Sequence, residues 1–79
     1  MEITIKDLIP IRIYKKDETG FLTFLERLEL PCLPRVGEFF SFYYNLDKTW
    51  IGCKIEEITY SFGRNGKFEA VEFSVVISK

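Results

Sequence analysis

Residues 58–77, ITYSFGRNGKFEAVEFSVVI, alternate apolar and polar side chains on both sides of Asn65-Gly66. An Asn-Gly pair between alternating segments is the strongest short-range signal of a β-hairpin, because a type I′ turn needs φ > 0 at both central positions. Counting outward from this turn places Tyr60 opposite Val71 and Ile58 opposite Phe73. We therefore predict an antiparallel hairpin with this register.

The inward-facing positions of the first strand change parity between Ile55 and Ile58. One extra residue at Glu56-Glu57, a β-bulge, would explain the change and would bend the strand. Beyond the bulge, Ile55 aligns with Val75 and Cys53 with Ile77. The sequence therefore predicts a long, bulged fourth strand.

A second hairpin is predicted upstream, where residues 39–44 (FFSFYY) can pair with residues 50–55 (WIGCKI). We place Tyr44 opposite Ile51, which makes every pair on that face apolar and sets Tyr43 opposite Gly52 on the other face. The rings assigned to the core by the two hairpins are Phe40, Phe42, Tyr44, Tyr60 and Phe73.

The N-terminal part also has a period of two. Isoleucines share one parity from Ile3 to Ile13, which is typical of a strand, and Pro10 favours an edge position or a kink because it cannot donate to a ladder. After the polar turn at residues 15–20, residues 21–30 alternate with Glu26 out of place. We predict a strand there, and a helix at 21–30, which would make the fold α+β, is the alternative.

These elements make a single all-β domain over residues 1–79, a small five-stranded antiparallel barrel whose closure would remove exposed edges. The segment Leu33-Pro34-Arg35-Val36-Gly37-Glu38-Phe39-Phe40, followed by strands at 50–62 and 68–77, resembles Src-homology-3-like (SH3-like) barrels. It is also similar to small uncharacterised bacterial barrel proteins. The resemblance implies a fold and a class of binding roles, and it brings no catalytic residue. The ligand motif of peptide-binding members has no match here.

Composition excludes several function classes. The chain has 79 residues, 47% of them hydrophobic, a net charge of −1 and no His. This content excludes a disordered chain, and the lack of His removes the commonest general base and metal ligand. No arrangement of Cys, Ser or paired carboxylates replaces it, so we expect a protein that is not an enzyme and needs no metal or cofactor.

Cys32 and Cys53 are the two cysteines. The N-terminal residues lack the basic start and apolar core of a signal peptide, so we expect a reduced pair in a cytoplasmic protein. No apolar run approaches the length of a membrane span, and we expect no membrane association.

Three rings are left on the face opposite the core: Phe39, Tyr43 and Trp50. With Lys54 and Arg64 at their rim, they form the candidate partner-binding site, because Tyr and Trp are preferred anchors of protein interfaces. We expect a protein partner, either a second copy or another protein. The rings could instead cover a second small core, or stack bases of a single-stranded nucleic acid, which the near-neutral charge disfavours.

Overall fold

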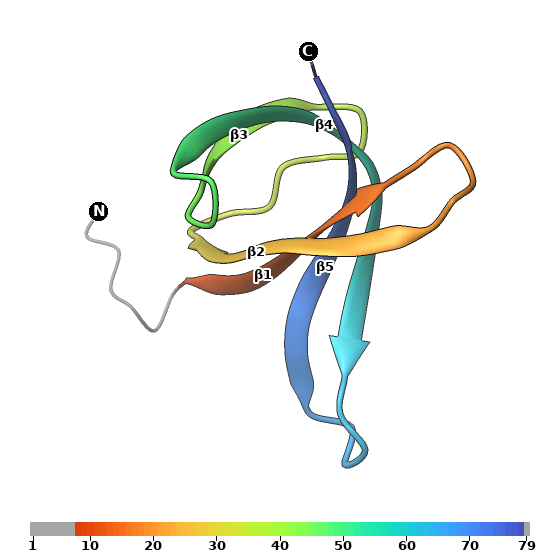
Figure 1. Ribbon diagram of the computed structural model, residues 1–79. Helices are drawn as coiled ribbons and strands as arrows, with labels where there is room; N and C mark the ends of the chain where they lie inside the picture. The colour runs from red at the N-terminus through yellow and green to blue at the C-terminus, as the bar shows by residue number, and fades with distance from the viewer. Residues whose placement is uncertain (1–7, 79) are drawn as a thin grey trace.

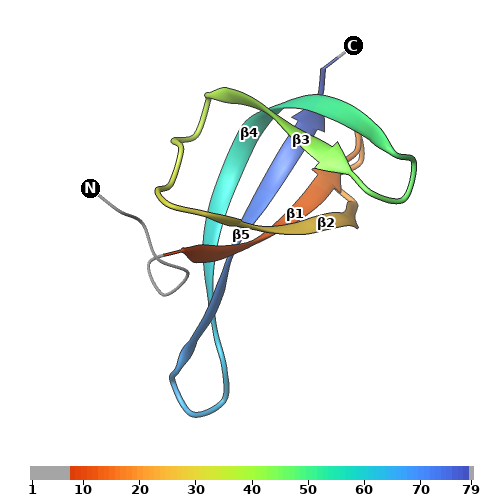
Figure 2. The same cartoon turned by 90° about the vertical axis from the view of Figure 1, so that its left-hand side faces the viewer.

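The computed structural model describes residues 8–78, which form one sheet of five strands. The strands are β1 (Ile9–Lys16), β2 (Leu22–Leu30), β3 (Phe39–Tyr44), β4 (Thr49–Phe62) and β5 (Phe68–Ile77). Their order in the sheet is β2-β1-β5-β4-β3, and the sheet curls into a half-barrel (Figure 1; Figure 2). The predicted all-β class and the five strands are confirmed.

The middle strand, β5, has a neighbour on both sides and supplies the centre of the core. Val71, Phe73 and Val75 alternate along it and are fully buried. Beside them lie the inward-facing residues of the neighbouring strands, such as Ile13 on β1 and Ile55 on β4, which are also fully buried. The period of two in the sequence therefore becomes one apolar layer on the concave side of the sheet.

The pairing of β4 with β5 follows the predicted register. Tyr60 lies opposite Val71, Ile58 opposite Phe73 and Ile55 opposite Val75. The register shifts between Ile55 and Glu57, so the bulge lies where the change in parity predicted it.

The turn between β4 and β5 differs from the prediction in its type. Gly66 N donates to Gly63 O at 2.9 Å, and Gly66 has a φ of 79°. Asn65 is not among the described residues with positive φ, so the turn is not type I′. A three-residue loop with a left-handed Gly is the next common hairpin connection. A further shift between Ser61 and Phe62 offsets the extra loop residue, which is why a wrong turn type still predicted the right pairs.

Residues 22–30 form a strand, and the helical alternative is wrong. The pattern was ambiguous because β2 contains its own bulge: Ile13 lies opposite Glu26, whereas Tyr14 lies opposite Phe24. Leu25 is the extra residue, and it packs against the core. Glu26, which looked out of place, is half-buried, and its Oε1 accepts a hydrogen bond from Asn45 N at 3.0 Å.

The prediction of a purely antiparallel barrel is wrong, because β1 and β5 are parallel. These strands are far apart in the chain, and their alternating patterns fit either direction. β1 is also not at an edge, contrary to the expectation from Pro10. Pro10 is tolerated because it pairs only with β2, and the pairing with β5 begins one residue later, at Ile11. Ile3 and Ile5 lie outside the described residues.

The β3–β4 register is shifted by two residues from the prediction. Tyr44 lies opposite Thr49 instead of Ile51, because the loop has four residues and closes with Lys48 in the left-handed region at φ 53°. A shift of two keeps every side chain on its predicted face but changes its partner. Tyr43 consequently faces Trp50, and Phe39 faces Lys54.

Gly66 tests the β4–β5 turn. Replacement by Val should lower the free energy of unfolding by at least about 1–2 kcal/mol, because the left-handed region is costly for L-residues and most costly for β-branched ones. No heavy atom lies within 4 Å of a Cβ built on Gly66, so the loss would come from backbone strain. Urea unfolding gives the measurement. Gly66→Asn is the matched control and should lose less, since Asn tolerates this conformation; equal stability of wild type and Gly66→Val would contradict the turn.

Candidate interaction surface

The convex side of the β3–β4 hairpin carries Phe39, Tyr43, Trp50 and Lys54, which we call the aromatic face. Tyr43 and Trp50 are direct cross-strand partners, and their rings meet edge to face with centroids 5.6 Å apart. Tyr43 is 40% exposed and Trp50 is 69% exposed. The contact orders the two rings against each other and leaves much of their surface in solvent.

Phe39 and Lys54 form the second cross-strand pair of the aromatic face. Lys54 Nζ lies 6.0 Å from the centroid of the Phe39 ring, at the outer limit of a cation–π contact. Phe39 is 71% exposed. The Tyr43–Trp50 pair therefore lies at one end of the aromatic face and the Phe39–Lys54 pair at the other, about 13 Å apart along the strands.

Small residues separate the two pairs. Ser41 lies opposite Gly52, and a Cβ built on Gly52 would meet Ser41 Oγ at 3.7 Å. The sequence had placed Tyr43 over this glycine; the two-residue shift gives the position to Ser41 instead. Neither residue rises between the rings, so their facing sides remain accessible.

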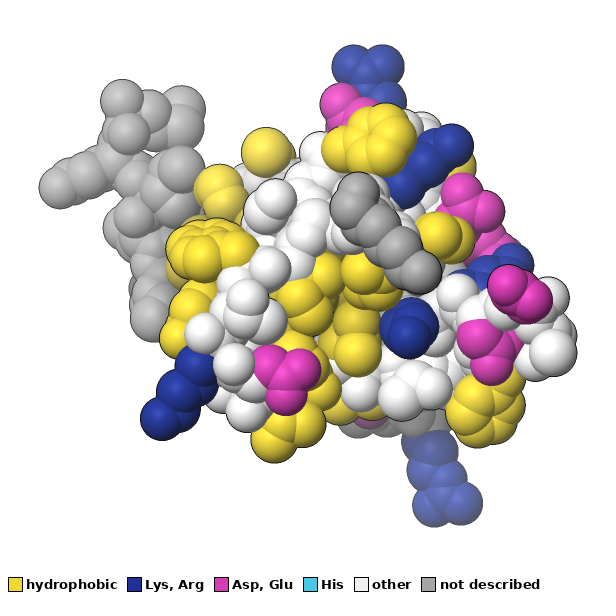
Figure 3. All heavy atoms as spheres, turned by 45° about the horizontal axis from the view of Figure 1, so that its top comes forward, with side chains coloured by type: hydrophobic (Ala, Val, Ile, Leu, Met, Phe, Trp, Pro, Cys, Tyr) yellow, Lys and Arg dark blue, Asp and Glu magenta, His cyan; other side chains and the backbone are white. Residues whose placement is uncertain are grey.

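The alternative that these rings cover a second small core is not supported by the described residues, given their exposure. Figure 3 shows the end of the molecule at the top of Figure 1, where hydrophobic side chains gather at the surface with single charged groups among and around them. The outward side of β1 and β5 is different, because Arg12 Nη1 lies 3.0 Å from Glu72 Oε2 of the neighbouring strand. An ion pair thus occupies this part of the outward side, next to the Tyr14 ring, which meets Phe24 of β2 edge to face at 5.6 Å.

Arg64 does not belong to the aromatic face. It lies in the turn of the β4–β5 hairpin, whose distal part extends away from the body of the sheet as an arm (Figure 1; Figure 2). The turn is at one end of the molecule and β3 is at the other. The structure brings together four of the five predicted site residues, and Arg64 is not at their rim.

Aromatic side chains of the arm were missed by the sequence reasoning. Tyr60 was assigned to the core, but it is 56% exposed, although its partner on β5, Val71, is buried. Phe62 and Phe68 are also exposed, and their rings lie edge to face at 5.9 Å. Alternation predicts the face of a residue but not how far the core reaches along the strand. The length of β4 was the available signal.

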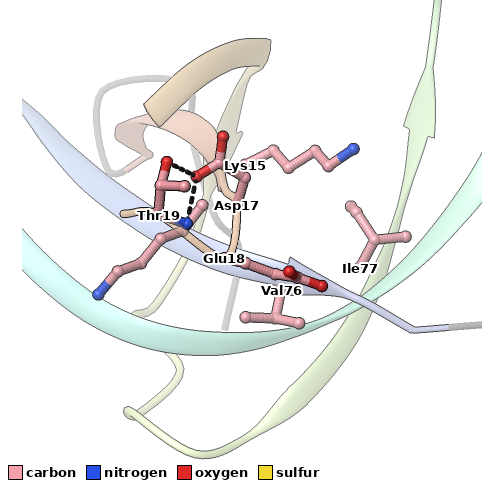
Figure 4. A pocket seen from close by; sticks show the side chains of 7 residues that line it. Lys15, Asp17, Glu18, Thr19, Val76 and Ile77 are labelled. Carbon is pink, nitrogen blue, oxygen red and sulfur yellow. Dashed lines mark hydrogen bonds between the residues drawn. The ribbon is translucent and has the colours of Figure 1, made fainter. Parts of the chain in front are cut away.

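A cavity of about 580 Å³ adjoins the aromatic face at Val76, which lies opposite Lys54. The β1–β2 turn forms its other wall (Figure 4). The carboxylate in this wall, Asp17, accepts hydrogen bonds from Thr19 Oγ1 at 2.7 Å and from Phe21 N at 2.9 Å. These bonds, all accepted by Oδ1, lower the pKa of Asp17 and hold the turn.

The two cysteines are unpaired and differ in environment. Cys32 is exposed in the segment between β2 and β3, and Cys53 is buried in β4. Burial raises the pKa of the Cys53 thiol to about 11, which favours the unreactive neutral form. Within residues 8–78, no group of three or more Cys, Asp or Glu side chains is placed to hold a metal ion.

Cys53 also predicts a pH dependence of stability. Its thiol has an ordinary pKa of 9.0 and a folded-state pKa of about 11, so between these values unfolding releases a proton. Stability should be unaffected by this group below pH 9 and should fall as the pH rises towards 11. Urea unfolding of wild type and Cys53→Val across this range measures the effect, because Val removes the titrating group. Parallel curves for the two proteins would contradict the shifted pKa.

Comparison with known proteins finds no match among family models, curated sequences or solved structures. The resemblance to SH3-like barrels therefore stays a prediction. Its motif has a local role: Gly37 has a φ of 92°, Arg35 N donates to Glu38 Oε1 at 2.5 Å, and Gly37 N donates to Ile55 O at 2.8 Å. The motif thus makes a turn that leads the chain into β3. None of the described residues belongs to a helix of the length and apolarity needed to cross a membrane.

Proposed function

We propose that this protein is a noncatalytic interaction module, or a small subunit, that self-associates through its aromatic face. The observation that carries the proposal is the pairing of Tyr43 with Trp50 at 5.6 Å, in which Trp50 stays 69% exposed and Tyr43 40% exposed. Rings already ordered by a neighbour lose little conformational freedom when a partner covers them. Trp and Tyr in such positions are the side chains that most often dominate binding energy.

The charge of the chain is compatible with association of identical copies. The net charge is −1, so two copies experience little long-range repulsion. Lys54 is the cation of the aromatic face, and its position over the Phe39 ring gives it a partner within the same copy. The unpaired thiols fit a reducing compartment, and we propose a cytoplasmic location.

Single-stranded nucleic acid is the alternative partner, since strand aromatics beside a cation can stack bases. The structure offers it less support than the sequence did. The basic groups that could line a groove are divided between two ends of the molecule. Lys54 belongs to the aromatic face and Lys48 to the turn next to it, whereas Arg64 and Lys67 lie at the tip of the arm. A continuous basic track beside the stacked rings is therefore not formed by these residues.

Trp50→Ala tests the proposal. We expect wild type to associate and the variant to do so at least about tenfold more weakly, because truncating a central aromatic anchor commonly costs more than about 1.4 kcal/mol. Sedimentation velocity over a range of concentrations gives both dissociation constants. Phe62→Ala is the matched control, as Phe62 is 60% exposed but lies on the arm, and it should associate like wild type.

The proposal fails if wild type is monomeric at every concentration, or if Phe62→Ala weakens association as much as Trp50→Ala does. Binding of a single-stranded oligonucleotide at low salt, lost steeply as salt is raised and weakened by Trp50→Ala, would favour the alternative.

A further inference from the structure

The two outer strands of the sheet, β2 and β3, differ in how their free edges are protected. β2 carries Glu26, Arg27 and Glu29, and charges of this kind are the usual protection against edge-to-edge pairing. β3, residues 39–44 (FFSFYY), has no charge, no Pro and no Gly. Within the described residues, the β3 edge has no neighbouring strand.

The hydrogen bonds around β3 show which of its backbone groups point outward. Ile55 exchanges bonds with Gly37 and Glu38, just before β3 begins. In an antiparallel pair alternate residues bond the same neighbour, so Cys53 and Ile51 continue the ladder with Phe40 and Phe42. Ser78 N donates to Gly52 O at 2.7 Å, as expected if the intervening residues of β4 bond β5 instead.

By the same alternation, Phe39, Ser41 and Tyr43 direct their N–H and C=O groups away from β4. Asn45 has the same parity, and its N–H is the one that bonds Glu26 Oε1 at 3.0 Å. β2 thus satisfies the last outward N–H beyond β3. The groups of the three residues before it have no partner in any bond recorded among the described residues.

We propose that these three residues pair with the same three residues of a second copy, joining two sheets at β3 about a two-fold axis through Ser41. In this register Ser41 faces Ser41 of the other copy, and Phe39 faces Tyr43 in both directions. Partners that face each other across an antiparallel ladder share a side of the sheet, and all three residues are on the convex side. In every pair, both side chains therefore lie on the convex side, and the N–H and C=O groups of the two residues point at each other.

A second copy is favoured because the edge is complementary to itself. A two-fold axis pairs β3 with a second copy of its own sequence, and because β3 carries no charged residue this pairing brings no like charges together. The register also joins the aromatic faces of the two copies into one surface. A cavity of about 500 Å³, lined by residues 30–35 of the preceding segment, adjoins Phe40 and Ser41, so the chain itself does not fill the space beside this part of the edge.

This inference rests on the proposed self-association and assigns its geometry. Ser41→Pro separates the two ideas, because proline removes the outward N–H at the proposed axis while leaving the ring residues and the β4 ladder in place. We expect it to weaken association at least tenfold in sedimentation velocity, whereas Ser41→Ala, which keeps the N–H, should associate like wild type. Circular dichroism and thermal unfolding confirm that each variant is folded.

A cross-link tests the register without relying on proline. In the Cys32→Ser background, Ser41→Cys should form a disulfide-linked dimer on oxidation by copper phenanthroline. Facing residues of a hydrogen-bonded pair have Cα atoms about 5.5 Å apart, within disulfide range. Asp47→Cys, in the exposed turn after β3, is the matched control and should form little dimer.

Loss of association in both Trp50→Ala and Ser41→Pro, together with the Ser41→Cys cross-link, supports edge pairing. If Trp50→Ala dissociates the protein while Ser41→Pro remains associated and Ser41→Cys does not cross-link, the aromatic face acts without edge pairing and this inference is overturned alone. A monomeric wild type overturns both proposals, because neither the aromatic face nor the β3 edge would then join two copies.

Discussion

The packing of β5 against β1 and β4 is the constraint on which the rest of the structure depends. Val71, Phe73 and Val75 have no exposed surface beyond 1%, and the fully buried residues of the two neighbouring strands are aligned with them. In a chain of 79 residues one apolar layer supplies most of the burial available, so each strand must present its apolar parity to β5. The outer strands, β2 and β3, are held through β1 and β4.

Bulges allow strands of this length to satisfy that constraint. β4 has 14 residues and changes parity at Glu56, so Cys53 and Ile55 face the core before the bulge and Ile58 faces it after. Without the extra residue, one half of the strand would present its polar side inward. The same strand therefore joins the body of the sheet at one end and forms the arm at the other. The bulge at Leu25 acts differently on β2, because beyond it Phe24 and Leu22 lie opposite Tyr14 and Lys16 and are exposed.

Local chemistry was sufficient to predict the parts of the fold that depend on neighbours in the chain. The Asn65-Gly66 turn and the parity change at Glu56 predicted the β4–β5 pairs. The predicted turn type was wrong, but the pairs were still right because a bulge near Phe62 compensates for the extra loop residue. The parallel pairing of β1 with β5 was not predictable in this way, since Ile11 and Ile13 present the same apolar side in either direction. Likewise, nothing local to Tyr60 indicates that the core ends before it.

In the candidate site too, the sequence predicted on which side of the sheet a residue lies but not which residue it contacts. Phe39, Tyr43, Trp50 and Lys54 were assigned to one side of the sheet by parity, and a two-residue error in register left that assignment intact. The contacts within the site, Tyr43 with Trp50 and Lys54 with Phe39, depend on the register itself, which is determined by the four-residue turn ending at Lys48. Arg64 has no such link, because position along β4 separates it from these residues. The turn at Lys48 thus determines which rings of the face contact each other, and it also brings Ser41 opposite Gly52, so only small side chains lie between the two pairs.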